Sequence, residues 1–451
     1  MATPGPARRP RGWVWELARL AVRTFYRVDR VGPRLPDGSV LLVANHPNGI
    51  LDPAVIQTTA GRQVRFLAKS TLFRHHPLSL FVRHSGAVPV YRHMDAGADT
   101  RRNVEMFQAV EAALADGETI CLFPEGISHE HGRLEPLRTG AARMALSSAS
   151  TGHPVAIVPV GLNFEHLAAF RSRVTTVFGT PLQYDDLLST RGLVDDETDA
   201  VRNLTDRIRE NLRRVVVEAD PRRDLPLVAR VARLYAVARG MSRAPKDRTV
   251  RRRLIAEGIE KLRHEDPERL SSLIVLLRRY DTSLERFGLR DEDVDRRVTA
   301  RAVARFIVRE GSLALFLVPL AVAGLVIFWL PYWATGYVSQ WAPDLQSRAT
   351  WRLVGGFLMF GTWIALLSVA VGTQLGAQTA LAVAGGLVAL AYAGLMALGR
   401  EASVLRTIST FFALKRTPIK TRARLTRQRA ALATVLEQVG EWLEQRDGSP
   451  S

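Results

Sequence analysis

The sequence predicts an α/β domain with a central mixed sheet flanked by helices, followed by a helical domain and C-terminal transmembrane helices. Two observations indicate the first part: apolar runs of strand length alternate with helical stretches between residues 39 and 182, and several runs end at polar or charged residues. A third indicates the last part, because residues 311–343 and 353–399 contain no Asp, Glu, Lys or Arg. A helix needs about 20 residues to cross a bilayer, so both stretches are long enough.

The N-terminal segment, residues 1–30, is predicted to be an amphipathic helix that lies in the membrane interface. Trp13, Leu17, Leu20 and Phe25 fall on roughly one face, and arginines occupy other positions. The segment has no long apolar run, so it does not resemble a signal peptide. A helix packed on the next domain is the alternative interpretation.

Residues 31–190 form the predicted α/β domain. Its expected strands are residues 39–45, 64–68, 86–91, 118–123, 155–162 and 174–179. Helices are predicted over residues 100–117, which close with a glycine, and over residues 139–150. Strands separated by helices indicate a sheet of mixed or mostly parallel order that helices cover.

Residues 191–310 are predicted to form a separate helical domain, because Arg, Glu and Asp become frequent and apolar residues recur at spacings of three and four. We see no catalytic constellation in it. Its arginines could meet lipid phosphates, but a solvated helix face is the simpler explanation.

The transmembrane region, residues 311–399, is expected to hold one helix at 312–333 and a hairpin within 353–399. The tail, residues 400–451, is expected to be helical and cytoplasmic, since residues 400–430 carry nine Lys or Arg and one acidic residue. A multi-pass protein with its catalytic domain also on the cytoplasmic side needs an even number of crossings. Three helices conflict with this unless one is re-entrant or two form a shallow hairpin.

The charge balance predicts an anionic partner, because 62 Lys and Arg face 44 Asp and Glu in 451 residues, a net charge of +18. Much of the excess lies beside the apolar segments, which favours an anionic phospholipid membrane over a nucleic acid. The single cysteine, Cys121, excludes an internal disulfide framework and a multi-cysteine zinc site, and fits a reducing compartment.

The first candidate for chemistry is the stretch LLVANHPNGILDP, residues 41–53, in which a buried type of strand ends at His46 and Asp52 follows after a turn. The ends of strands are where α/β sheets usually present reactive groups. A carboxylate beside an imidazole can fix its tautomer and stabilise the cation that forms when it accepts a proton. A purely structural histidine is the alternative.

Three further segments follow. In CLFPEGISHEHGRLEPLRTGAARMAL, Glu125 projects from a strand exit and Gly126 allows backbone to approach a ligand closely. In HSGAVPVYRHMD, Arg92 closes a strand and offers a fork of donors that suits a phosphate. In IVPVGLNFEHLAAFRSRVTTVFGTPL, Arg171 and Arg173 precede another strand, where capping a surface loop is the alternative role.

Taken in this order, the four segments resemble the glycerol-phosphate acyltransferase superfamily of PlsC-like enzymes over about residues 35–185. The resemblance implies that His46 is a general base oriented by Asp52, which activates a hydroxyl to attack an acyl-CoA or acyl-carrier-protein thioester. It further implies that Arg92 binds the acceptor phosphate and that Glu125 and Gly126 shape the acceptor pocket. Lys69, Arg171 and Arg173 are additional phosphate candidates. No cofactor or metal is expected, since the acyl thioester is a co-substrate.

The acceptor is suggested by the spacing in the first motif. The family pattern has four residues between His and Asp, whereas five separate His46 from Asp52. That longer spacing, with Asn after His and Asp-Pro at the end, is similar to the fungal-type glycerol-3-phosphate and dihydroxyacetone-phosphate acyltransferases. We therefore expect a membrane-bound sn-1 O-acyltransferase of phospholipid biosynthesis. Acylation of lysophosphatidic acid at sn-2, giving phosphatidic acid, is the alternative.

Other classes of function fit less well. A serine hydrolase would need a Gly-x-Ser-x-Gly elbow, which is absent, and Ser128 lies in a loop segment. The histidine pairs His75 with His76 and His129 with His131 lack the spacing of a zinc hydrolase. A non-catalytic lipid-binding membrane protein is opposed only by the presence of all the motif residues.

Overall fold

The computed structural model of the chain describes residues 12–73, 79–91, 103–129, 131–188, 194–219, 224–295, 319–320, 322–342 and 345–447. It divides into two compact units. Unit 1 comprises Met1–Leu227, Ala244–Ala256 and Pro343–Thr350, and unit 2 comprises the rest. Unit 1 contains the whole sheet and the candidate site residues.

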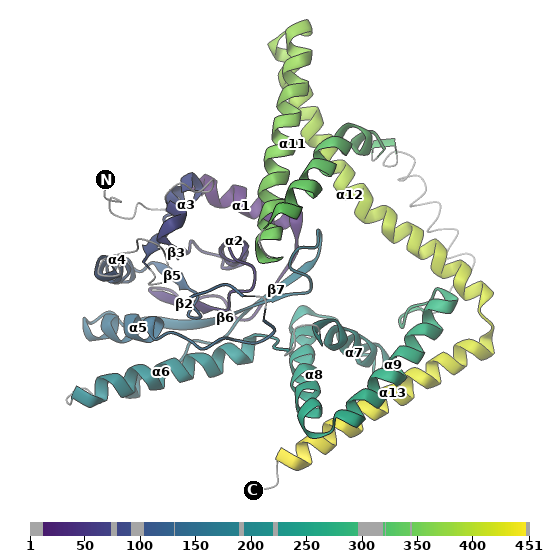
Figure 1. Cartoon of the computed structure of the whole chain (residues 1–451), viewed down its shortest axis with the longest axis horizontal. Helices are drawn as coiled ribbons and strands as arrows, with labels where there is room; N and C mark the ends of the chain where they lie inside the picture. The colour runs from purple at the N-terminus through teal and green to yellow at the C-terminus, as the bar shows by residue number, and fades with distance from the viewer. Residues whose placement is uncertain are drawn as a thin grey trace. The chain divides into compact units, whose positions relative to one another are not determined.

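Seven strands form one sheet in the order β1-β7-β6-β2-β5-β3-β4 (Figure 1). Their bounds are β1 Arg27–Val31, β2 Val40–Ala44, β3 Arg65–Lys69, β4 Val88–Val90, β5 Thr119–Leu122, β6 Ala156–Phe164 and β7 Arg173–Phe178. All described neighbouring pairs are parallel except β6 with β7, so the sheet is mixed, as predicted. The central strands β2 and β5 are buried at every position, which is why they consist of apolar and small residues.

Helices cover both faces of the sheet (Figure 1). On one face lie α1 (Gly12–Phe25) and α2 (Leu51–Thr59), and on the other lie α4 (Asn103–Ala115), α5 (Gly140–Ser150) and α6 (Val194–Val215). The short α3 (Ser79–His84) precedes β4. Leu41 and Val43 of β2 point into the core beneath α4, α5 and α6, because alternate residues of a strand face the same side. The predicted α/β class is confirmed.

Two features of unit 1 differ from the sequence prediction. Strand β1 was not expected: its sequence, RVDRV, has three charged residues among five and is no apolar run, and the strand lies at a partly exposed edge of the sheet. The predicted domain boundary near residue 190 falls too early. Helix α6 buries Leu204, Ile208 and Leu212 in the same core as β2, so it belongs to the α/β unit and not to a separate helical domain.

The N-terminal helix α1 packs on α2, and its Val14, Trp15 and Val22 are buried. The ring of Trp15 lies 5.6 Å from that of Phe66 on β3. Of the face predicted from Trp13, Leu17, Leu20 and Phe25, Leu20 is 61% exposed and Phe25 is buried. The packing agrees with the alternative drawn from the sequence, and the membrane-interface role stays a prediction.

Unit 2 contains most of α7 (Leu225–Ala238), the end of α8 (Pro245–Glu265), α9 (Pro267–Phe287) and α13 (Ile419–Asp447). Partly buried ion pairs connect α7 to α9 and to the turn after it: Arg230 of α7 bonds to Asp281 of α9 and to Asp291. Helix α13 packs on α9, so residues predicted to form a separate tail are part of this helical unit.

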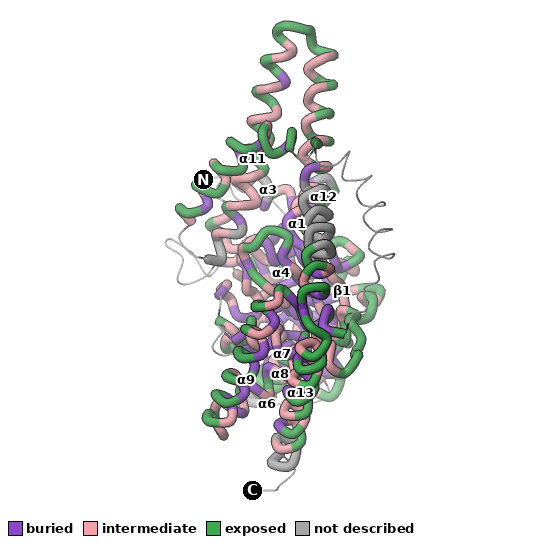
Figure 2. Tube along the Cα trace, turned by 90° about the vertical axis from the view of Figure 1, so that its right-hand side faces the viewer, coloured by how far each residue is buried: buried purple, intermediate pink, exposed green. Residues whose placement is uncertain are grey.

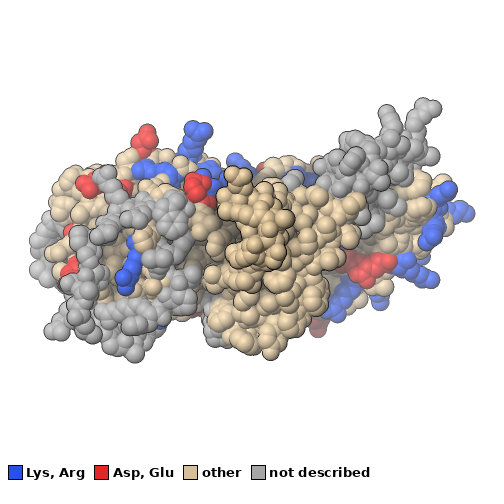
Figure 3. All heavy atoms as spheres, turned by 90° about the horizontal axis from the view of Figure 1, so that it is seen from above, with Lys and Arg blue, Asp and Glu red and all other residues tan. Residues whose placement is uncertain are grey.

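Within the described residues, three helices are long and apolar enough to cross a membrane: Val322–Trp341, Thr350–Leu375 within α11 (Leu345–Leu375), and Ala377–Gly394 within α12 (Ala377–Arg416). The first overlaps the helix predicted at 312–333, whose residues 312–318 and 321 lie outside the described residues, and the other two form the predicted hairpin around Gly376. Their side chains are largely exposed, drawn green and pink along α11 and α12 in Figure 2. Seen from the hairpin end, the surface over these helices shows no charged side chain (Figure 3). Such exposed apolar surface is typical of lipid-facing helices.

Candidate active site

The candidate site lies where the parallel strands β2 and β5 end side by side. Val43 of β2 pairs with Leu122 of β5, so His46 and Glu125 leave the sheet at the same edge. This is the edge at which α/β proteins usually bind their ligands. The ring of Phe123, which follows β5, stacks on the imidazole of His46, with ring centroids 3.9 Å apart and planes 9° apart.

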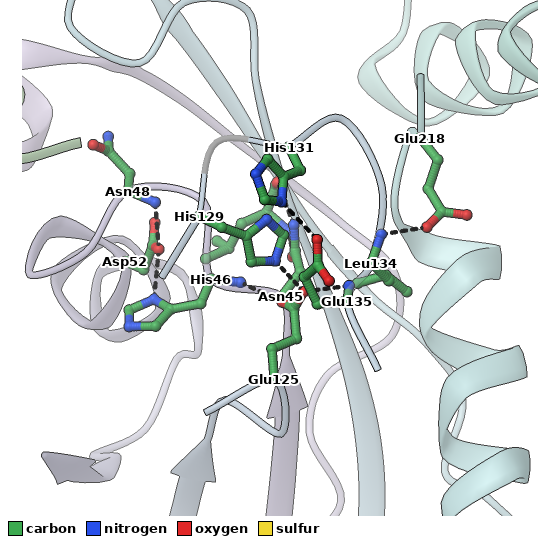
Figure 4. A network of polar contacts seen from close by, with 11 residues as sticks. Asn45, His46, Asn48, Asp52, Glu125, His129, His131, Leu134, Glu135 and Glu218 are labelled. Atoms are coloured by element: carbon green, nitrogen blue, oxygen red, sulfur yellow. Dashed lines mark hydrogen bonds and ion pairs between the residues drawn. The ribbon is translucent and has the colours of Figure 1, made fainter. Parts of the chain in front are cut away.

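His46 and Asp52 form a hydrogen-bonded pair. Nδ1 of His46 lies 2.8 Å from Oδ2 of Asp52, and the N–H of Asn48 donates to the same oxygen at 2.7 Å (Figure 4). Asp52 is fully buried in the first turn of α2, whose N-terminal dipole favours a negative charge. A carboxylate at Nδ1 selects the tautomer with its proton there, which leaves Nε2 as a proton acceptor.

Two effects act in opposite directions on the pKa of Asp52. Burial raises the pKa of the Asp52 carboxyl group, and the hydrogen bond and charge of His46 lower it again; the net pKa is above the ordinary value. The His46 side chain is 19% exposed, so the imidazole can be reached by a substrate while its partner cannot. This arrangement can perform general-base chemistry.

Glu125 holds the site together from within the protein. Its Oε1 accepts from the N–H of His46 at 3.0 Å, and its Oε2 accepts from the N–H of Glu135 at 2.8 Å and contacts Nε2 of His129 (Figure 4). The side chain is 3% exposed overall. Both carboxylate oxygens are thus engaged inside the fold. The role predicted for Glu125 in the acceptor pocket stays a prediction, and the structure adds a positioning role.

Gly126 adopts a conformation that favours glycine, with φ of 73°. A Cβ at this position would lie 2.4 Å from Nε of Arg138, so the absence of a side chain lets Arg138 lie over the turn. Arg138 is exposed and its N–H donates to the carbonyl of Pro124 at 2.8 Å. It is a cation beside the site that the sequence analysis did not select, although it stands in the quoted PLRTG segment.

The remaining predicted site residues are Lys69, Arg92, Arg171 and Arg173. Lys69 ends β3 and pairs in register with Val90, the last residue of β4. Arg92, two residues beyond, lies outside the described residues, as do His75 and His76. The structure thus brings Lys69 to the chain segment that leads to Arg92.

Arg171 and Arg173 lie at the start of β7, and both are engaged. Arg173 pairs with Asp29 of β1 at 2.8 Å. Arg171 has φ of 58°, which is uncommon for a residue with a side chain, and its guanidinium donates to the carbonyl of Arg23 at 3.2 Å. The structure does not bring either arginine into contact with His46.

Three residues near the dyad were not predicted to belong to the site: Asn48, Tyr26 and His129, which was noted only as one of a histidine pair. The side chain of Asn48 donates to the hydroxyl of Tyr26 at 2.9 Å and to the carbonyl of Leu167 at 3.3 Å. The signal for Asn48 was its place inside the motif; Tyr26 carried no local signal, because only the fold brings it to the turn.

One group of side chains has the composition of a metal site. The ligand atoms of His129, His131 and Glu135 lie within 4.8 Å of one another. In the structure Nε2 of His129 contacts Glu125, and Nδ1 of His131 bonds to Glu135 at 2.6 Å. These pairings account for the cluster as two histidine–carboxylate pairs.

Comparison with known proteins gives one family match and partial relatives. Residues 26–163 match the family model described as Acyltransferase. An uncharacterized acyltransferase of Schizosaccharomyces pombe is 30% identical over 274 residues, which are 58% of this chain and 39% of that protein. Glycerol-3-phosphate O-acyltransferase 1 of Saccharomyces cerevisiae is 31% identical over 229 residues, which are 49% of this chain and 30% of that protein.

The chain therefore spans only 39% and 30% of the lengths of these two relatives. Among solved structures, the 1-acyl-sn-glycerophosphate acyltransferase PlsC of Thermotoga maritima is similar with a TM-score of 0.32 and 19% identity, over 44% of this chain and 78% of that one.

Proposed function

We propose that this chain, whose residues 26–163 form a domain of the Acyltransferase family, is a membrane-bound O-acyltransferase that esterifies a glycerol-phosphate acceptor. The observation that carries the proposal is the buried Asp52 carboxylate 2.8 Å from Nδ1 of His46, at the edge of the sheet where ligands bind. An acyl transfer to a hydroxyl needs a group that removes the hydroxyl proton, and a neutral imidazole with a free Nε2 is suited to it.

The reaction proceeds in two steps on one acceptor. Nε2 of His46 takes the proton from the acceptor hydroxyl while its oxygen attacks the carbonyl carbon of the acyl thioester. The tetrahedral intermediate collapses, the carbon–sulfur bond breaks, and the thiolate takes the proton back from the imidazolium. The products are an ester and a free thiol of CoA or acyl-carrier protein. Asp52 stabilises the imidazolium between the two steps.

The phosphate of the acceptor is assigned to cations around the same edge of the sheet. Lys69 ends β3, and Arg92 follows the neighbouring strand β4 by two residues in the sequence. Arg138 is a third cation, beside the glutamate of the second motif. Arg173 is the weakest of the predicted phosphate ligands, because its guanidinium already pairs with Asp29.

Among acceptors, glycerol-3-phosphate or dihydroxyacetone phosphate, acylated at sn-1, has the best support. Five residues separate His46 from Asp52, and the similar protein of Saccharomyces cerevisiae is named as a glycerol-3-phosphate acyltransferase. Lysophosphatidic acid is the second candidate, since the same dyad would serve its sn-2 hydroxyl.

The test is an acyl-transfer assay on the purified full chain in detergent. Radiolabelled acyl-CoA and acyl-carrier protein are each offered with glycerol-3-phosphate, dihydroxyacetone phosphate and lysophosphatidic acid, beside a His46→Ala variant. We expect His46-dependent transfer to one of the first two acceptors. Transfer to lysophosphatidic acid alone would establish the second candidate, and no His46-dependent transfer at all would leave a non-catalytic lipid-binding role.

The membrane setting completes the proposal. The three apolar helices would anchor the chain, with one of them re-entrant or two forming a shallow hairpin, so that the α/β unit and the basic end of α12 both lie on the cytoplasmic side. There both the soluble acyl donor and the glycerol phosphate are available, and the acylated product can enter the adjacent leaflet. Anionic lipid headgroups would be the partner of the basic residues.

A further inference from the structure

A buried polar network connects the turn of the first motif to two distant parts of unit 1. The Asn48 side chain donates to the Tyr26 hydroxyl at 2.9 Å and to the Leu167 carbonyl at 3.3 Å. The Tyr26 hydroxyl in turn donates to the same carbonyl. Asn48 is 0% exposed and Tyr26 1%. The network joins the junction of α1 and β1, the turn after β2, and the segment after β6.

The network reaches the dyad through the backbone of Asn48. Its N–H donates to Oδ2 of Asp52 at 2.7 Å, and this is the oxygen that bonds to His46. Any shift of Asn48 would therefore move the hydrogen bond that orients Asp52. Asn48 stands two residues after His46 and four before Asp52, so its position fixes both ends of the turn.

Stability alone does not explain an asparagine at this position. Oδ1 of Asn48 is buried and has no hydrogen-bond partner among the residues that the structure describes. A buried polar atom without a partner costs free energy, which an apolar side chain would avoid. Polar groups kept at such a cost are expected at functional sites.

We propose that Tyr26 and Asn48 are positioning residues of the acyl-transfer dyad, which hold the turn so that Asp52 meets Nδ1 of His46. This inference rests on the proposed function. It makes the first strand and the segment at Leu167 part of the catalytic apparatus, although neither carries a reacting group.

The kinetic test compares Tyr26→Phe and Asn48→Ala with Tyr184→Phe in the full chain. Tyr26→Phe keeps the ring, which packs edge-on to Phe25 and Phe164, and removes only the hydroxyl. Tyr184→Phe is the matched control, because its buried hydroxyl bonds to the backbone of Val155. We expect kcat to fall about three- to tenfold for Tyr26→Phe and further for Asn48→Ala, with KM unchanged, and no change for the control.

Two features separate positioning from a loss of stability. The double variant should lose no more kcat than Asn48→Ala alone, because both changes break one network. The pH profile of kcat/KM should differ from that of wild type in Asn48→Ala, since a displaced turn weakens the amide hydrogen bond that favours ionised Asp52. Additive losses, or pH profiles equal to that of the control, would overturn the inference.

A readout without substrate keeps this test separate from the proposed function. The rate at which diethyl pyrocarbonate modifies His46, followed by mass spectrometry, reports the imidazole itself. We expect this rate to differ from wild type in Tyr26→Phe and Asn48→Ala but not in Tyr184→Phe, since a shifted turn moves the carboxylate that orients the imidazole. Rates equal to that of wild type in both variants would contradict the positioning role even if acyl transfer were never observed.

Discussion

The main-chain N–H of His46 donates to Oε1 of Glu125 across 3.0 Å, although the two residues stand 79 positions apart in the chain. The candidate base is thus held twice, by Glu125 at its backbone and by Asp52 at its ring. Because Glu125 also accepts from the N–H of Glu135, the exits of β2 and β5 are fixed to each other and to the following loop. The glutamate of the second motif therefore governs the geometry of the histidine of the first.

Replacing His46 by alanine should remove catalysis without unfolding the protein. General-base catalysis supplies on the order of a hundred- to ten-thousand-fold in rate, so kcat is expected to fall by about that factor. His153→Ala, at an exposed histidine in the same unit, is the control and should retain full activity. Retention of acyl transfer by His46→Ala would exclude the proposed base.

Asp52→Asn should change how stability depends on pH. Burial raises the pKa of Asp52 in the folded state above its unfolded value, so wild type loses stability from this group as pH rises from about 4 through the raised pKa. The variant cannot ionise and lacks this loss. The difference in melting temperature, variant minus wild type, should therefore increase from pH 4 to pH 7, measured by tryptophan fluorescence in detergent. A difference that stays level or decreases would be inconsistent with the buried carboxylate being destabilised by its charge.

Gly126→Ala and Gly117→Ala form a matched pair. Both glycines have positive φ, 73° and 77°, so each alanine should cost about 1–2 kcal/mol of stability. Only at Gly126 does the new Cβ meet a neighbour, the side chain of Arg138; at Gly117 nothing lies within 4 Å. We expect Gly126→Ala alone to raise KM for the phosphate acceptor, because Arg138 must move. Equal KM values in both variants would argue against a role of Arg138 in binding.

Two introduced cysteines test the sidedness of the membrane protein. The native Cys121 is buried, so labelling of Val104→Cys and Ile419→Cys, at positions 62% and 83% exposed, can be followed separately. Membrane-impermeant maleimide should label both only after intact cells are permeabilised, since both positions are expected in the cytoplasm. Labelling of one from outside would place the α/β unit and the start of α13 on opposite sides of the membrane.

The resemblance drawn from the motifs was confirmed by the family match, and six of the seven strands were predicted to within a few residues. The central strands were predictable because parallel strands buried on both faces are continuous apolar runs. The edge strand β1 was not, because its charged residues Arg27, Asp29 and Arg30 break the apolar run. The sequence did not indicate that α6 packs on the sheet, because its outer face is charged like those of the helices that follow.

At the site, strand position suggested His46, Asp52 and Glu125 as candidates, and the resemblance of the four segments to the family gave them their predicted roles. What the sequence could not supply is how each side chain is used. The glutamate was expected to shape the acceptor pocket, which stays a prediction; its partners in the structure are backbone N–H groups and His129, which only the fold brings near. Tyr26 was missed for the same reason, since its contact with Asn48 arises from the packing of α1 beside α2.

Helix α12 continues without a break for 40 residues, about 60 Å at 1.5 Å per residue, which is twice the thickness of the hydrocarbon layer. The apolar first half and the basic second half of α12 therefore belong to one continuous helix, so the angular positions of their residues around the axis are fixed relative to each other. Inserting a single alanine after Arg400 would turn every basic residue beyond it by about 100° around the axis without changing composition. The angular direction of the basic residues is thus set by how the apolar half is rotated in the bilayer.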